Sequence, residues 1–400
     1  EGFVFDRSVH VLHLRTHWVK NLIEKLLNEN STILIEHVRK AKVYFEGEHI
    51  PYPFQSFFYL LSDKQVVDEC IHGIKRALNK QKVSPQNFEQ YVDYYFGYGI
   101  AKHFMLPYNE KLWTVPLSKL SYEWAERFVP KPNLNELLHT ATNVTTQTQA
   151  LNREWGYNPR FWYPERGGIQ NIPEAILRHL RKGKLMMKRE VETIDVRRRQ
   201  ALLDDGDVID YDAIVSTVPL PHLLKIIQKS PLMLKEVVNN MGYVSVFNVN
   251  FGIDREIDLN AHWLYFPQRN IIFHRVGVPS TLSSSMAPKD CSSLSVEVSY
   301  SKFKPLGSKK KVKERIIRDL VKVGVIRSKN EIVSELKNDL KYAYVLYDKN
   351  YTLSRIAAHT FLKKQDIYSI GRFGSWRYLS MEDCIVEGHE TARQLNNACR

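Results

Sequence analysis

The chain has 400 residues, of which 44% are hydrophobic and 12% aromatic, so it can bury a core large enough for two or three domains. A net charge of +13 favours anionic partners, such as nucleic acid, membrane headgroups or phosphorylated small molecules. The basic runs at 197–199 and 309–311 are typical of solvated faces, so no nucleic acid partner is expected.

Apolar runs and cysteines narrow the class further. No stretch reaches the eighteen or so apolar residues of a membrane span, and the chain starts at Glu1 without a leader, which indicates a fragment or a processed chain. The cysteines form no CxxC pair, so neither a metal site nor a disulfide framework is expected. These features predict a soluble, cytoplasmic protein, and a homo-oligomer is compatible with them.

The first third of the chain reads as a short sheet region followed by helices. Helical periodicity runs over 19–26, and alternating segments at 33–37 and 42–45, with a turn at Gly47, predict a β-hairpin. From Asp63 to Thr148 the signals are almost wholly helical, with breaks at prolines. This part is interpreted as a helical insertion.

The remainder alternates helix and strand before strands take over. A helix follows YPERGG at 163–168, and strands follow at 184–196 and near 214. Strands dominate from Tyr243 to Val298 as a largely antiparallel sheet. A helix at 312–323 and a final helix from Met381 complete the pattern. The fold class is therefore α/β.

No GxGxxG fingerprint, which a dinucleotide-binding fold places between its first strand and helix, occurs in the chain. The nearest pattern, Gly97 and Gly99, follows a helical segment and lacks a third glycine. It indicates a turn between helices rather than a phosphate loop.

Six ordered segments carry a resemblance to a known family. They are PYPFQ at 51–55, FGYGIAKHFMLPYNEKLWTVP at 96–116, WAERFVP at 124–130, YPERGG at 163–168, WLYFP at 263–267 and GRFGSWRY at 371–378. Together they resemble the FAD-dependent UDP-galactopyranose mutases, within the wider flavin amine oxidase and protoporphyrinogen oxidase-like group. The resemblance spans nearly the whole chain, with the GxGxxG segment missing at the N-terminus.

The resemblance implies three domains. The first is a Rossmann-like FAD-binding domain at 1–30, 155–225 and 366–400, N-terminally incomplete because its first βαβ unit is lacking. The second is a helical domain at 56–154. The third is an antiparallel sheet domain for the substrate, at 31–55 and 226–365.

The implied reaction is an isomerisation. Similar enzymes interconvert the pyranose and furanose forms of a UDP-sugar through an adduct at N5 of the reduced flavin, with no net redox change. FAD, in its reduced form for catalysis, is thus the expected cofactor, and a UDP-sugar is the expected small-molecule partner.

Arg127 and Arg275 are the principal catalytic candidates. An arginine suits a diphosphate leaving group because its fixed fork of donors can bind two phosphate oxygens while charge develops. Both match family positions, and they are expected to converge on the diphosphate from different domains. His10 is the third candidate, beside the flavin.

The resemblance also assigns substrate contacts. Tyr344 and Tyr378 match tyrosines that donate hydrogen bonds to the diphosphate. The other matching positions are Tyr52, Gln55, Asn109, Trp113, Asn158, Trp263 and Tyr265.

Cofactor contacts are expected in three parts of the chain. His10 lies in a loop that usually reads Gly-Gly-His but here reads Ser8-Val9-His10, and losing both glycines is expected to alter that loop. The start of the last helix offers amides to FAD oxygens. The full set is His10, Val191, Gly371, Arg372, Met381, Glu382 and Asp383.

Two other functions stay open, because a fold does not fix a reaction. One is an FAD-dependent oxidase or dehydrogenase of the amine oxidase or protoporphyrinogen oxidase type, which would not need the two arginines and two tyrosines. The other is an inactive fragment or binding protein that cannot retain FAD, which the absent glycine fingerprint favours.

Overall fold

A computed structural model of the chain describes residues 2–79, 84–125, 129, 131–151, 159–180 and 185–398. Helices and sheets both contribute, so the predicted α/β class is confirmed. The chain forms two compact units. The first comprises Glu1–Val11, Leu27–Ile172 and Val244–Lys341, and the second comprises Leu12–Leu26, Pro173–Tyr243 and Tyr342–Arg400. The predicted helical domain falls in the first unit, whereas the predicted sheet domain also includes residues 226–243 and 342–365 of the second unit. The predicted domain boundaries stay a prediction.

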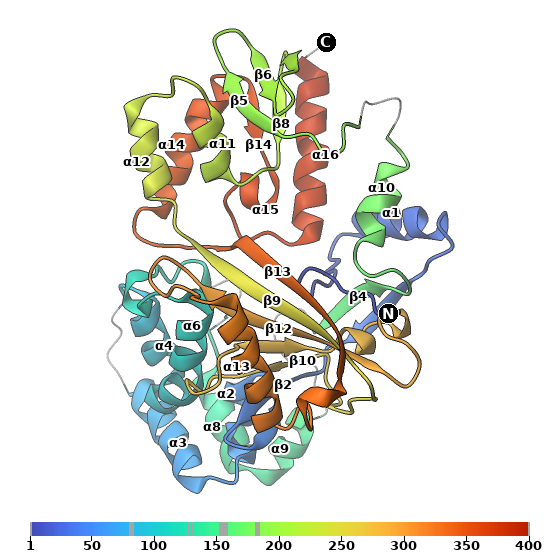
Figure 1. The fold of residues 1–400 in the computed structure, drawn as a ribbon. Coiled ribbons are helices and arrows are strands. Elements are labelled where there is room, and N and C mark those ends of the chain that lie inside the picture. The colour runs from blue at the N-terminus through green and yellow to red at the C-terminus, as the bar shows by residue number, and fades with distance from the viewer. Residues whose placement is uncertain are drawn as a thin grey trace. The chain divides into compact units, whose positions relative to one another are not determined.

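A seven-stranded sheet organises the first unit, in the order β13-β9-β12-β11-β10-β2-β3 (Figure 1). Pairing is antiparallel from β9 through β12 and β11 to β10, and again between β2 and β3, whereas β10 and β2 run parallel. The expected antiparallel sheet region is therefore present. The strands are β2 (Ala41–Phe45), β3 (Glu48–Pro51), β9 (Tyr243–Ile253), β10 (Trp263–Tyr265), β11 (Arg275–Gly277), β12 (Ser292–Tyr300) and β13 (Ile332–Val345).

The hairpin predicted around Gly47 is present, but the segment at 33–37 is not part of it. The turn at Glu46 and Gly47, both with positive φ, joins β2 to β3. β1 (Leu34–Val38) instead pairs with β4 (Arg160–Pro164), where Arg160 Nη1 lies 2.9 Å from Glu36 Oε1. The edge of β2 that β1 would have used is occupied by β10. The predicted hairpin turn at Gly47 is therefore confirmed, whereas the predicted strand at 33–37 belongs to a different pair.

One face of the sheet forms the main core of the first unit. Helix α13 (Lys309–Lys322) packs against it, and its Ile316 and Leu320 are fully buried among apolar side chains of β9 and β12 such as Val249 and Val296 (Figure 1). Short 3-10 turns connect the strands: η4 (Pro279–Thr281), η5 (Ser284–Met286) and η6 (Lys329–Glu331).

The segment between β3 and β4 is helical, as predicted. Its elements are α2 (Phe54–Phe57), η1 (Phe58–Leu60), α3 (Lys64–Leu78), α4 (Phe88–Phe96), α5 (Tyr98–Ile100), the π-helical η2 (Ala101–Met105), α6 (Leu106–Trp113), η3 (Leu117–Lys119), α8 (Leu134–Thr142) and α9 (Val144–Leu151).

Glycines let α3 and α5 approach each other closely. Gly97, with φ of 80°, separates α4 from α5, which confirms the predicted turn between helices. A Cβ on Gly97 would lie 2.5 Å from the carbonyl of Gly73, and one on Gly99 would lie 2.4 Å from the backbone oxygen of Glu69. These glycines are required by helix packing and are not a phosphate loop.

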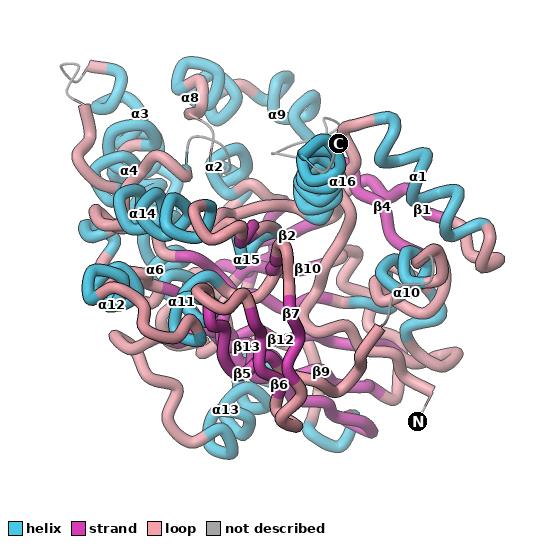
Figure 2. Tube along the Cα trace, turned by 90° about the horizontal axis from the view of Figure 1, so that it is seen from above, coloured by secondary structure: helices cyan, strands magenta, loops and turns pink. Residues whose placement is uncertain are grey.

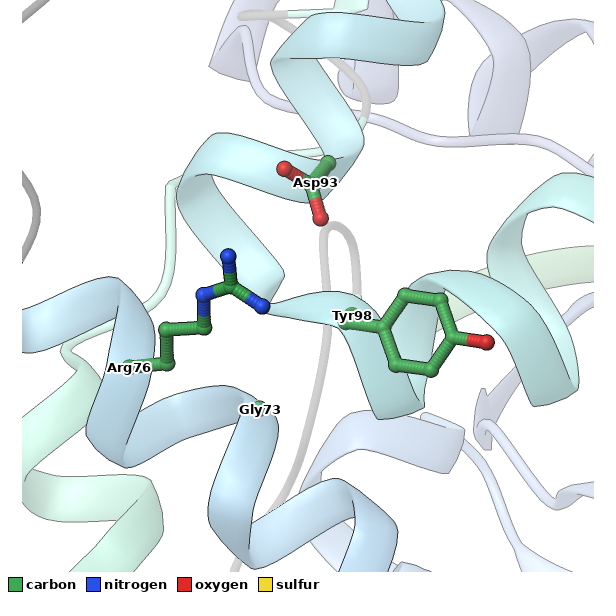
Figure 3. Close-up of a pocket in the computed structure, with 4 residues that line it drawn as sticks. All are labelled: Gly73, Arg76, Asp93 and Tyr98. Carbon is green, nitrogen blue, oxygen red and sulfur yellow. The ribbon is translucent and has the colours of Figure 1, made fainter.

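A small pocket opens beside this crossing (Figure 3). It holds about 150 Å³ and is lined by Gly73 and Arg76 of α3, Asp93 of α4 and Tyr98 of α5. Among these described lining residues, none belongs to the set predicted from the sequence.

The second unit combines small sheets with helices. β14 pairs in parallel with β8, and β5, β6 and β7 form an antiparallel meander. Helices α11, α12 and α14 lie side by side (Figures 1 and 2) and enclose a core with Trp376, which is 1% exposed. The elements are α1 (His17–Asn28), α10 (Asn171–Leu177), β5 (Val191–Asp195), β6 (Gln200–Leu203), β7 (Val208–Asp210), β8 (Ile214–Ser216), α11 (Leu220–Ile226), α12 (Leu232–Asn239), α14 (Tyr351–Lys363), β14 (Ile367–Ser369), α15 (Gly371–Gly374) and α16 (Met381–Ala398).

Within the described residues, none of the helices combines the length and the apolar character that crossing a membrane would require.

Substitution of Gly97 by alanine tests the helix crossing. The new Cβ would meet the Gly73 backbone, and φ would be strained, so we expect the free energy of unfolding to fall by about 3 kcal/mol in chemical denaturation. Gly206→Ala is the matched control, because Gly206 also has positive φ but has no atom near its Cβ position. That variant should lose only about 1 kcal/mol. Equal losses would contradict the packing explanation.

Candidate active site

Strand register places a polar row on one face of the large sheet. Tyr265 pairs with Arg275, Arg275 with Glu297, and Glu297 with Asn248. Directly paired residues point to the same face of a sheet, so these four side chains are neighbours. The alternating residues form the opposite, apolar row that packs in the core: Leu264, Val276, Val296 and Val249. One face of the sheet thus supplies the core and the other supplies a polar site.

Arg275 is held by a two-point ion pair with Glu297. Arg275 Nε lies 2.9 Å from Glu297 Oε2, and Nη2 lies 2.6 Å from Oε1. The Glu297 side chain is 1% exposed and that of Arg275 is 22% exposed. Burial alone would raise the pKa of Glu297, but the Arg275 guanidinium and the neighbouring His274 together outweigh it and hold that pKa well below its usual range. The carboxylate is therefore charged, and it orients the arginine.

His274, the residue before Arg275, also lies beside the Glu297 carboxylate. Its Nε2 lies 3.3 Å from Glu297 Oε2, and its ring is 1% exposed. Complete burial, aided by the nearby cations Arg275 and Lys111, lowers the pKa of His274. We assign a neutral imidazole, so Arg275 alone balances the charge of Glu297.

Aromatic side chains cluster beside this row. The rings of Tyr52 and Tyr265 are 4.9 Å apart, and Trp263 Nε1 donates to the Tyr265 hydroxyl at 2.9 Å. The Arg39 guanidinium lies 5.2 Å from the centre of the Tyr52 ring. Burial raises the pKa of Tyr52 to about 12, so its hydroxyl stays protonated and can donate. The structure therefore brings together Tyr52, Trp263 and Tyr265, which were predicted separately.

Tyr108 joins the cluster although sequence reasoning did not single it out. Its ring meets Tyr265 edge-on at 5.4 Å and stacks on Phe104 at 5.4 Å. Phe104 and Tyr108 are four residues apart on the π-helix and α6, so they share a face. The spacing of four residues between two aromatic side chains is a sequence signal that could have indicated Tyr108, whereas the motif pointed to the next residue, Asn109.

Asn109 and Trp113 lie on α6, with Trp113 as its last residue. Asn109 Nδ2 donates to the Met105 oxygen at 2.7 Å, and Trp113 Nε1 donates to Asn109 Oδ1 at 3.2 Å. Both side chains are buried, and Trp113 packs on Trp124 at 4.7 Å. Their observed partners are internal, as expected of core residues, and their assignment as substrate contacts stays a prediction. Gln55, in α2, is half-buried and also stays a prediction.

Lys111, between those two residues, is buried as well. Its ammonium donates to the carbonyl oxygens of Phe266 at 2.6 Å and Gln268 at 3.0 Å. Burial lowers its pKa well below the usual range. Lys111 therefore fixes the loop between β10 and β11, which follows Tyr265 and leads to Arg275.

The N-terminal segment covers part of the polar face. Ser8 has φ of 68°, the left-handed conformation that glycine adopts easily, and its amide donates to Asn248 Oδ1 at 3.2 Å. Its hydroxyl donates to Glu297 Oε1. His10 is exposed, with Nδ1 3.2 Å from the Ser8 oxygen. Polar contacts thus stabilise, in a residue other than glycine, a backbone conformation that favours glycine.

The predicted residues of the second unit form a different group. The Arg372 guanidinium lies 4.0 Å from the centre of the Tyr378 ring, and the Tyr344 ring stacks parallel to that of Tyr378 at 6.3 Å. Arg372 also donates to the carbonyl oxygens of Leu379 and Ala343. Three predicted residues, Arg372, Tyr344 and Tyr378, are therefore in mutual contact.

The first turn of α16 is capped by its own side chains. Ser380 Oγ accepts from the amide of Asp383, while Asp383 Oδ2 accepts from the amide of Ser380 at 2.8 Å, as in a capping box. Arg15 Nε lies 2.8 Å from Glu382 Oε2, and Nη2 lies 2.6 Å from Asp383 Oδ1. The side chains of Glu382 and Asp383 thus form ion pairs with Arg15. Met381, which lies between Ser380 and Glu382 in the chain, is half-buried.

The remaining predicted positions are scattered. Val191 begins β5, beside a bulge, and is exposed. Its cofactor role stays a prediction. Arg127 and Asn158 lie outside the described residues.

Comparisons with known proteins fit this geometry. Residues 1–396 match the family model described as flavin containing amine oxidoreductase. The chain belongs to this family. FAD is accordingly its cofactor, as expected from the sequence.

The fold of this flavoenzyme is similar to those of several solved structures. The structure of reduced UDP-galactopyranose mutase is similar with a TM-score of 0.86 and 28% identity, over 94% of this chain and 80% of that one. Wild-type putrescine oxidase bound to putrescine has a TM-score of 0.61 and 15% identity, over 99% and 91% of the two chains. The Pyrococcus furiosus protein PF1083 has a TM-score of 0.51 and 16% identity, over 87% and 83%. The latter two share the fold.

The flavoenzyme's residues can accommodate a cofactor at Gly371. This residue has φ of 75°, and a Cβ built on it would meet only Thr217, at 4.0 Å, so the backbone there is open to a ligand. Its amide donates to Glu387 Oε2 at 2.6 Å, which fixes the turn. The fold thus retains a glycine where close approach is possible, and these residues fit FAD.

A buried histidine beside Trp263 makes stability depend on pH. Burial, together with His37 and Lys40, lowers the pKa of His262 to about 4. The folded state then binds fewer protons than the unfolded state below pH 6.5, so stability should fall between pH 6.5 and 4, by at most about 3 kcal/mol. His262→Asn retains an acceptor for the Lys40 amide and should flatten this part of the urea-measured profile.

His72→Asn is the control for that substitution, because His72 is exposed on α3. Its profile should match that of the unsubstituted protein. An unchanged slope in His262→Asn would contradict the assignment of the acid-sensitive group.

Proposed function

We propose that this flavoenzyme is an isomerase similar to UDP-galactopyranose mutase, which interconverts the pyranose and furanose forms of a UDP-sugar. The observation that carries the proposal is the row in which an oriented arginine, Arg275, adjoins the aromatic cluster of Tyr52, Trp263 and Tyr265. A fork of cationic donors next to aromatic faces suits a ligand with a diphosphate and flat or apolar ring faces. The similarity to reduced UDP-galactopyranose mutase supports the same choice.

Arg275 would act on the leaving group. When the bond between the sugar and UDP breaks, negative charge develops on the diphosphate, and a pre-oriented guanidinium stabilises that charge without having to reorganise. Glu297 provides this orientation through both donors of the fork. Arg127 is proposed as a second ligand of the diphosphate. Tyr344 and Tyr378 would add neutral hydrogen-bond donors.

The aromatic cluster would bind and shield the sugar nucleotide. Tyr52 and Tyr265 offer hydroxyl groups on adjacent rings, and Tyr108 contacts the Tyr265 ring edge-on. Rings at these distances give a rigid apolar wall with polar tips. Gln55, Asn109, Trp113 and Asn158 complete the proposed substrate set.

The proposed FAD contacts are His10 in the first unit and a group in the second unit: Val191, Gly371, Arg372, Met381, Glu382 and Asp383. A bound reduced flavin would supply the electron-rich centre that bond exchange at the anomeric carbon needs. Gly371 would let the backbone approach the cofactor, and the first turn of α16 would direct the positive end of its dipole toward FAD oxygens.

The diphosphate assignment predicts a loss of UDP affinity on changing Arg275. Arg275→Lys keeps a charge beside Glu297 but loses the fork, and we expect UDP binding, measured by calorimetry, to weaken by about 1.5 to 3 kcal/mol. Arg269→Lys is the control, because Arg269 lies in the same β10–β11 loop but is 73% exposed in a surface pair with Glu110. Equal affinity in all three proteins would contradict the role of Arg275.

The reaction itself separates the mutase from an oxidase. Incubation of the FAD-loaded protein, reduced with dithionite, with UDP-galactofuranose should yield UDP-galactopyranose by chromatography, and no peroxide should form from putrescine in air. Peroxide formation without isomerisation would favour the oxidase that the family and the putrescine oxidase fold allow. Absence of both activities in protein that retains FAD would favour a binding protein.

A further inference from the structure

Glu297 connects two parts of the site that the proposed function treats separately. Its side chain is 1% exposed and lies in the middle of the polar row, between Arg275 and Asn248. An uncompensated carboxylate at such a depth costs several kcal/mol, so its contacts are strongly determined. Three groups face it: Arg275, His274 and Ser8.

The two oxygen atoms of the Glu297 carboxylate contact different sets of these groups. Oε2 accepts from Arg275 Nε at 2.9 Å and faces His274 Nε2 at 3.3 Å. Oε1 accepts from Arg275 Nη2 at 2.6 Å and also from the Ser8 hydroxyl. Arg275 and Ser8 therefore share one oxygen atom, and a rotation of the carboxylate that releases one donor changes the hydrogen bond of the other.

Ser8 in turn determines the conformation of the loop that carries His10. Its φ of 68° is unfavourable for a residue with a side chain, and its contacts with Glu297 and Asn248 offset this cost. Two further hydrogen bonds fix the Asn248 side chain. Its Nδ2 donates to Ser295 Oγ at 2.9 Å, and its Oδ1 accepts from Asn338 Nδ2 at 3.0 Å. Glu297 is therefore a polar link between the loop and Arg275.

We propose that Glu297 is a positioning residue that couples Arg275 to the Ser8–His10 loop, so that engagement of Arg275 by an anionic ligand is transmitted to the loop. A diphosphate that accepts hydrogen bonds from Arg275 weakens the hydrogen bonds between Arg275 and Glu297. The carboxylate then shifts its hydrogen bonding toward the Ser8 hydroxyl. The inference rests on the proposed function for the identity of the ligand. The coupling itself is a property of the ligand-free protein.

Hydrogen exchange of the loop amides tests the coupling without any ligand. Arg275→Met should raise the exchange rate of amides 8–11 at least fivefold, because Glu297 loses the partner that fixes its orientation. In a Glu297→Gln background, the same Arg275→Met change should raise it less than twofold. Peptides from β9 serve as the reference for intact folding. No change in the loop of the Arg275→Met variant would overturn the coupling, as would equal increases in both backgrounds.

Arg255→Met is the matched control. Arg255 Nε lies 2.9 Å from Glu331 Oε1, and the Arg255 side chain is 23% exposed, close to the 22% of Arg275, but neither residue of this pair contacts the loop in the described interactions. Its loop exchange should equal that of the unsubstituted protein. A loop response as large as that of Arg275→Met would mean general loosening and would overturn the specific coupling.

Addition of UDP then tests transmission from the ligand. In the unsubstituted protein, saturating UDP should change the loop exchange rate at least threefold, and Ser8→Ala should abolish that change while UDP affinity stays within threefold. If calorimetry detects no UDP binding at all, the proposed function fails, while the ligand-free comparison still decides the coupling. Bound UDP without a loop response would overturn transmission.

Discussion

A buried negative charge is the constraint on which the first unit depends. The Glu297 carboxylate lies within a sheet whose other face is a hydrophobic core, so a cation must lie beside it, and strand register supplies Arg275. The same face then needs a cover, which the N-terminal segment provides. Phe3 lies against Gly252, the Asp6 oxygen accepts from Asn250, and Ser8 reaches Glu297. The Glu297 charge, its ion pair with Arg275 and the covering N-terminal segment therefore depend on one another.

The sequence predicted elements whose signals are local. The helical insertion, the antiparallel sheet and the last helix from Met381 all follow from periodicity and caps within a few residues. The choice of strand partner did not, because β1 and β4 are distant in the chain and the pairing depends on which edge is already occupied. Partner choice is a property of the whole sheet.

The candidate site shows the same division. Motifs indicated Tyr52, Trp263 and Tyr265, and the fold gathers them. Glu297 and Lys111 were missed, because Glu297 lies outside the six segments and Lys111, although it lies inside the segment 96–116, was given no role. Both act on residues far along the chain, on Arg275 across a strand pair and on the loop after β10. Burial of a charged side chain identified them, and burial is visible only after folding.

Val9 fills the space that a side chain at position 277 would need. A Cβ built on Gly277 would lie 2.3 Å from Val9 Cγ2, so the two residues, 268 positions apart, occupy a single shared volume. Neither can change size alone without a clash or a cavity. Across descendants of this protein, the two sites should therefore covary: a lineage that acquires a glycine at position 9 becomes free to acquire a small side chain at 277. Substitution at one site would open or close an evolutionary route at the other.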